Sequence, residues 1–166
     1  MPTTGRSKNR RRNSRAARVA VQFACRAPGA PAAARLRAFA RAAANAGSCV
    51  TLRVAGAAET RRLNRTYRGR DEATNVLSFA YPRATVGAAR DPRPGDIVLC
   101  HPVIAREARA QRKSLEAHYA HLVVHGMLHL GGFDHQRMRE ALRMQRKETA
   151  ILARLGFGDP YACERA

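Results

Sequence analysis

The sequence predicts a single α+β domain, close to the α/β type. We expect a mixed sheet of about four strands packed with about five helices around a central, buried helix that carries histidines. Strand-like and helical segments alternate along the first hundred residues, and the rest of the chain shows only helical patterns. The chain has 166 residues, 45% of them apolar, which suits one domain with its own core.

The sheet is predicted from four short segments in which apolar and β-branched residues dominate. These strands are expected at 19–24, 49–55, 75–81 and 96–100. Helices at 32–46 and 57–68 separate the first three strands, and Gly47-Ser48 ends the first of these helices. Residues 82–95 contain three prolines and two glycines, so we expect a loop or flap there.

Three further helices are expected to complete the fold, at 102–113, 115–130 and 137–155. Pro102 suits the first turn of the first helix, Ser114 is the predicted N-cap of the second, and Gly156 ends the third. The middle helix has almost no polar face. It is therefore expected at the centre of the fold.

The chain is strongly basic, with a formal net charge of +19 and 31 Lys and Arg residues, of which three are Lys. Such charge favours a polyanionic partner, because each phosphate contact releases counterions. GC-rich coding and solubility are alternative reasons for it. Apolar runs fall short of the roughly 18 residues of a membrane span, and the N-terminus lacks the apolar core of a secretory signal. We expect a cytoplasmic protein that does not bind a membrane.

Residues 1–18 are expected to form a disordered basic tail, and residues 19–166 the single folded domain. The tail holds seven basic residues and no acid, so the domain keeps a formal net charge of 19 − 7 = +12. Three interpretations of it stay open: a solvated tail, an arm that adds RNA affinity, and a transit peptide. The four cysteines are widely spaced, which indicates reduced, packed side chains rather than a disulfide framework.

A metal site is expected where the middle helix ends. His125 and His129 are four residues apart, so a helix points both rings to the same side. Gly131-Gly132 breaks the helix and permits a sharp turn that can bring His135 to the same point. Three imidazoles around one ion leave a fourth position open, as in catalytic zinc sites. Three unrelated core histidines are the alternative.

The spacing His-x-x-x-His-x-x-Gly-x-x-His is also that of the metzincin proteases. Those enzymes have a glutamate as general base directly after the first histidine, where this chain has Gly126. A metallopeptidase is therefore expected only if a glutamate from elsewhere reaches the open position.

Three neighbours of the predicted ligands have two interpretations each. His118 and His121 lie on the same helix and are either partners of the metal ligands or core histidines. Asp134 either orients a ligand imidazole or caps the turn.

These residues resemble the YbeY family of bacterial rRNA-processing metalloproteins. Residues 125–135 fit its signature H-G-x-L-H-L-x-G-x-D-H throughout, and residues 63–79 fit the segment L-N-x-x-Y-R…D…T-[ND]-V-L-S-F. The likeness continues at 95–100 and 116–118, and it spans about residues 50–162. Ala73 and Ala80 stand where the family often has proline, which affects loop stiffness rather than chemistry.

The resemblance implies a single-strand-specific endoribonuclease that acts in 16S rRNA 3′-end maturation and ribosome quality control. It implies one Zn²⁺, for which the ligands are His125, His129 and His135. It also implies Arg68 as a catalytic residue, since a planar, permanently charged guanidinium suits a phosphate oxyanion; a solvated arginine at a helix end is the alternative.

The expected partners are single-stranded RNA, the rRNA of the small ribosomal subunit and proteins of that subunit, with no DNA. The alternative function is a non-catalytic assembly factor of the small subunit in which the metal stabilises the fold.

Overall fold

The computed structural model describes residues 16–81, 95–133 and 136–162, and it confirms the predicted α+β class. The strands of its mixed sheet are β1 (Arg18–Phe23), β2 (Cys49–Ala55), β3 (Val76–Ala80) and β4 (Gly95–Cys100). The helices are α1 (Ala33–Ala43), α2 (Ala57–Arg68), α3 (His101–Ala110), α4 (Leu115–Leu130) and α5 (Met138–Arg154).

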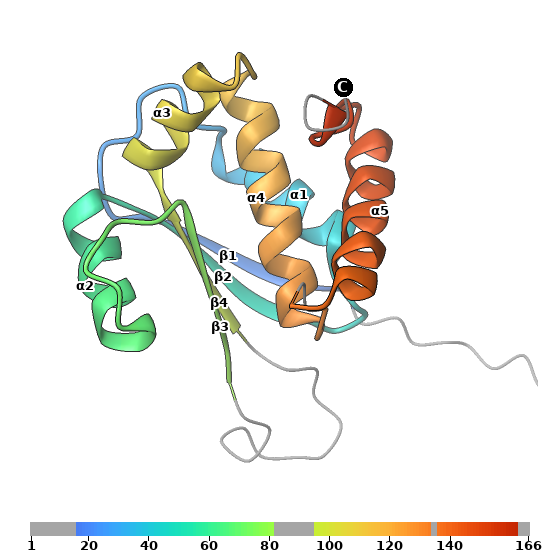
Figure 1. Cartoon of the computed structure of the whole chain (residues 1–166), viewed down its shortest axis with the longest axis horizontal. Coiled ribbons are helices and arrows are strands. Elements are labelled where there is room, and N and C mark those ends of the chain that lie inside the picture. The colour runs from blue at the N-terminus through green and yellow to red at the C-terminus, as the bar shows by residue number, and fades with distance from the viewer. Residues whose placement is uncertain (1–15, 82–94, 134–135, 163–166) are drawn as a thin grey trace, which may run out of the picture.

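The strands lie in the order β1-β2-β4-β3. β1 and β4 both run parallel to β2, whereas β3 is antiparallel to β4 and forms an edge of the sheet. Helices α1, α4 and α5 cover one face of the sheet, and α2 lies on the other (Figure 1). The face that carries α4 and the face that carries α2 therefore meet at the edge strand β3.

Helix α4 occupies the centre of the larger layer, as its apolar sequence predicts. The hydroxyl of Ser114 accepts a hydrogen bond from the amide of Ala117 at 3.1 Å, which confirms the predicted N-cap. Ten of the 16 residues of α4 are buried. The helix contacts α1, α3, α5 and both strands β3 and β4.

Two glycines allow α4 to approach the sheet closely. A β-carbon at Gly126 would lie 3.0 Å from both the Ile97 side chain and the Ser78 hydroxyl. A β-carbon at Gly95 would lie 2.7 Å from the side chain of Leu130. Both positions lack room for a larger residue, which fixes the end of α4 against β3 and β4.

Two helix ends differ from the prediction. The helix predicted to run to residue 46 ends at Ala43, because Ala44 adopts an extended conformation with ψ 144°. The helix predicted to run to residue 113 ends at Ala110, and Arg112 follows in the left-handed region with φ 52°. The other predicted boundaries agree within a residue or two.

Parts of the predicted tail and flap lie outside the described residues, namely 1–15 and 82–94. Arg18, placed in the tail by the prediction, begins β1, and its amide donates to the carbonyl of Ser48 at 2.7 Å. The described cysteines 25, 49 and 100 are free, as expected, but Cys49 is exposed rather than packed. Among the described residues, no helix is both long and apolar enough to cross a membrane.

Candidate metal centre

His125 and His129 point their rings toward each other from adjacent turns of α4. Their Nε2 atoms are 3.1 Å apart, and the ring centroids 4.6 Å. Two imidazole nitrogens that share a tetrahedral zinc ion at ~2.0–2.1 Å are about 3.3 Å apart. The two nitrogens therefore already have nearly the spacing that one ion requires.

The chain turns back directly after these histidines, as predicted from the paired glycines. The amide of Phe133 donates to the carbonyl of Leu128 at 3.0 Å, and that of Gly132 donates to the carbonyl of His129 at 2.9 Å. Gly132 has φ +91°, so this is a Schellman end that needs glycine. His135 and Asp134 lie outside the described residues, so the third predicted ligand stays a prediction.

A buried carboxylate on α5 supports His125 from behind. Glu148 is fully buried, and its Oε1 accepts a hydrogen bond from Nδ1 of His125 at 2.6 Å. Its Oε2 accepts from the hydroxyl of Tyr161, and Nε2 of His121 lies 3.7 Å from the same oxygen. Burial by itself raises the pKa of Glu148, but the hydrogen-bonding groups around it outweigh burial and lower the pKa to about 2.

The ionised Glu148 decides which nitrogen of His125 can bind a metal. Because a carboxylate only accepts hydrogen bonds, Nδ1 of His125 carries the proton. In the neutral ring the lone pair is then on Nε2, the atom that faces His129. A carboxylate behind a histidine in this way is the usual support of a metal ligand.

A second arrangement of ligands is possible around the same carboxylate. Among the described residues, His121, His125 and Glu148 place ligand atoms within 4.8 Å of one another and could hold a metal ion. The 2.6 Å separation of Nδ1 and Oε1 would close their angle at one ion to roughly 80°, well below the tetrahedral value. The contact between His125 Nδ1 and Glu148 Oε1 therefore has the geometry of a hydrogen bond. This favours the Nε2 atoms of His125 and His129 as the pair that binds the metal.

The two remaining histidines of α4 divide between the interpretations left open by the sequence. His121 contacts Tyr161 at 3.2 Å, so it belongs to the group around Glu148. His118 is buried, its Nε2 lies 2.8 Å from Glu107, and burial lowers its pKa. Glu107 also accepts from Asn75, so His118 belongs to a separate network.

Arg68, the last residue of α2, reaches the edge of the sheet. Its Nη2 donates to the carbonyl of Ser78 at 3.1 Å, and its guanidinium lies 5.9 Å from the ring centre of Phe79. Arg68, Arg70, His125 and His129 all line a groove of about 890 Å³. Two of the three predicted ligands, His125 and His129, thus line one groove with the predicted catalytic arginine.

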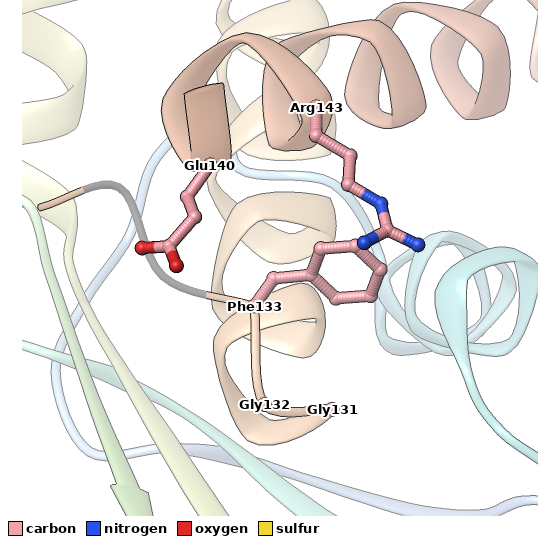
Figure 2. A pocket seen from close by; sticks show the side chains of 5 residues that line it. All are labelled: Gly131, Gly132, Phe133, Glu140 and Arg143. Carbon is pink, nitrogen blue, oxygen red and sulfur yellow. The ribbon is translucent and has the colours of Figure 1, made fainter. Parts of the chain in front are cut away.

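A smaller hollow of about 260 Å³ adjoins the turn that follows α4. Figure 2 shows Glu140 and Arg143 extending from the start of α5 on either side of Phe133. Gly132 and Phe133 line both this hollow and the larger groove. The glycine turn is therefore a shared wall between two open spaces.

Comparison with known proteins identifies the family of this chain. The model of the endoribonuclease YbeY family matches residues 32–156. The chain belongs to the endoribonuclease YbeY family. This membership confirms the resemblance found in the sequence. The match covers strands β2, β3 and β4, all five helices and the residues that line the groove, whereas β1 lies before it.

Several relatives are named "Endoribonuclease YbeY". That of Aromatoleum aromaticum is 53% identical over 132 residues, which cover 80% of this chain and 82% of the relative. That of Bordetella pertussis is 59% identical over 116 residues, 70% and 71% of the two chains. That of Stenotrophomonas maltophilia R551-3 is 48% identical and covers 89% and 94%. A solution structure of TM1509 from Thermotoga maritima aligns with a TM-score of 0.47, 20% identity and coverage of 86% and 97%.

Glu148 and Tyr161 of this member of the YbeY family were not expected from the sequence to belong to the site. A signal for Glu148 exists, since it stands on the buried face of α5 among apolar residues. That buried face consists of Met144, Glu148, Ile151 and Leu152. A glutamate at such a position needs a buried partner, and His125 provides one.

Proposed function

We propose that this chain is a metal-dependent endoribonuclease that cleaves single-stranded RNA. The observation that carries the proposal is the pair of Nε2 atoms of His125 and His129, 3.1 Å apart at the wall of an open groove. The YbeY family membership and the names of the relatives agree with this activity.

The residues present fit one zinc ion. His125 and His129 would hold it through Nε2, and His135 is proposed as the third ligand. The set is neutral, and Glu148 supplies a negative charge one hydrogen bond away from the ligand His125. When bound, zinc would lower the pKa of a coordinated water toward ~7 and polarise a phosphate oxygen.

Arg68 is proposed to bind the scissile phosphate in the groove. Its hydrogen bond to Ser78 and its position beside Phe79 hold the guanidinium at the groove without neutralising it, because neither partner carries a negative charge. A fixed cation of this kind stabilises charge that develops on a phosphate during cleavage.

We further propose that the enzyme acts in the cytoplasm, in 16S rRNA 3′-end maturation and ribosome quality control. Small-subunit rRNA and proteins are the proposed partners. The net charge of +19 supports a large polyanionic substrate. In this proposal the nuclease domain begins with Arg18, the first residue of β1, and the residues before it are a basic arm that adds affinity without sequence preference.

The decisive test measures bound zinc and RNA cleavage together in one series of variants. His125→Ala is expected to lose both. The matched control is His101→Gln, since His101 is a buried histidine that bonds to Tyr119 away from the groove. Chelation of the wild-type protein should stop cleavage, and added zinc should restore it.

Two results would reject the proposal. Cleavage by fully metal-free protein would remove the role of the ion. Wild-type protein that binds zinc and small subunits but cleaves no single-stranded RNA would instead establish the non-catalytic assembly factor.

A further inference from the structure

An aromatic and basic surface lies beside the groove, on the opposite face of the edge strand β3. It consists of Tyr67, Phe79 and Tyr81, together with the arginines of α2. Tyr67 and Tyr81 are 62% and 44% exposed, whereas Phe39 and Tyr119 are fully buried. The metal chemistry proposed above uses none of the three rings.

The three rings are held in fixed positions. Tyr67 packs edge-on against Phe79, with ring centres 5.2 Å apart and planes inclined by 68°. The hydroxyl of Tyr81 donates to Asp96 on the neighbouring strand β4. Tyr67 is thus supported by the residue beneath it while more than half of its surface remains open.

Positive charge lies on the helix that carries Tyr67, and the guanidinium of Arg68 lies 5.9 Å from the ring centre of Phe79. The exposed arginines on α2 and in the loop after it are Arg61, Arg62, Arg65, Arg68 and Arg70. Asp71 pairs with Arg61 at 2.7 Å and Glu72 is also exposed, so the five arginines outnumber the two exposed acids of this segment. Arg68 follows Tyr67 directly in the chain and also lines the groove, so the surface and the groove meet at this residue.

We propose that Tyr67 stacks on a base of single-stranded RNA that crosses the β3 edge on its way into the groove. Exposed aromatic rings beside a cationic track are what single-stranded nucleic acids bind, because every base has a flat face and every nucleotide a phosphate. In this arrangement Arg65 contacts the backbone next to the stacked base, and Arg68 contacts the phosphate that enters the groove. The inference rests on the proposed RNA substrate.

The test compares two oligonucleotides in binding to the full-length protein. One is a 12-nucleotide 2′-O-methyl RNA, which keeps its bases and stays intact during the measurement. The other has the same length and the same phosphates but abasic sugars. Tyr67→Ala is expected to weaken binding of the first by about 5- to 100-fold and to leave the second nearly unchanged. Tyr67→Phe should bind both as the wild type does.

Two control variants separate stacking from other effects. Phe23→Ala removes a ring with a similar exposure, 47%, from β1 at the far edge of the sheet, and it should change neither affinity. Arg65→Ala should weaken the binding of both oligonucleotides by the same factor. It should also reduce the slope of binding affinity against salt concentration by about one counterion. If Tyr67→Ala does not fold, Tyr67→Leu keeps apolar contact with Phe79 while lacking an aromatic face.

The inference is wrong if Tyr67→Ala binds the base-bearing RNA as tightly as the wild type, or if it loses equal affinity for the abasic chain. In either case the ring would serve a protein partner or the fold. Cleavage of unmodified RNA by the wild type is measured in parallel. Absence of cleavage would reject the proposed nuclease, whereas cleavage with an unaffected Tyr67→Ala variant would reject the stacking alone.

Discussion

Glu148 offers the sharpest test of the proposed metal centre, because its effect should reach the metal only through His125. The substitution Glu148→Gln keeps the shape and one acceptor oxygen for the proton on Nδ1 of His125, while it removes the negative charge. The carboxylate is fully buried and 2.6 Å from that nitrogen, so solvent cannot replace it.

The expected loss follows from the strength of that hydrogen bond. A bond to a charged group contributes about 1.5–3 kcal/mol, roughly twice a neutral one. Glu148→Gln should therefore cost about 1–1.5 kcal/mol, which is about tenfold in zinc affinity. Glu148→Ala also removes the acceptor and should approach 100-fold, the upper end for groups that support metal ligands.

The assay is competition for zinc with a coloured chelator at neutral pH. Glu107→Gln is the matched control, because Glu107 makes the same kind of bond to His118, at 2.8 Å, on the same helix. That variant should bind zinc like the wild type. Equal zinc affinity in wild type, Glu148→Gln and Glu148→Ala would refute the support of His125 by Glu148. Equal losses in Glu107→Gln and Glu148→Gln would show a general effect on α4 instead.

Three further predictions concern the fold. Gly126→Ala should lower the free energy of unfolding by about 1–2 kcal/mol, because its β-carbon would lie 3.0 Å from Ile97. Urea titration measures this change, and any gain in stability would contradict the close approach. Ser114→Ala should cost about 1 kcal/mol in the same assay, through loss of the cap on Ala117, and an unchanged midpoint would show that the cap is dispensable. Burial lowers the pKa of His101, so as the pH falls the unfolded chain binds a proton before the folded one does, and the free energy of unfolding should decrease below about pH 6.5. His101→Gln should reduce this dependence between about pH 7 and 5. The same dependence in the variant would show that His101 is not its source.

Most of the fold could be predicted because the pattern of apolar residues in each segment agrees with the place of that segment in the structure. All nine elements of the described residues were expected from periodicity, since strands alternate and the buried α4 lacks a polar face. The two helix ends that were misplaced have no local signal. Residues 42–44 are all alanine, which favours helix, yet the chain leaves α1 at Ala44. Arg112 takes a left-handed conformation that normally marks glycine.

The site was predictable only as far as its residues are close in the sequence. The spacing of His125 and His129 fixes their common direction on a helix, and the structure places their Nε2 atoms together. Glu148 lies 23 residues after His125 on another helix, so its contact depends on how α4 and α5 pack. Spacing alone cannot give that distance, although a glutamate on the buried face of α5 marks a buried partner.

Gly126 links the packing of α4 to the chemistry that the groove can support. The peptidase hypothesis needs a glutamate at this position, directly after the first histidine. The structure has no room for one, because even the first side-chain carbon would lie 3.0 Å from Ile97 and Ser78. A glutamate there would require α4 to move away from the sheet, which would displace the same turns that hold His125 and His129. The close approach that fixes the proposed ligands thus also excludes the protease base from this position.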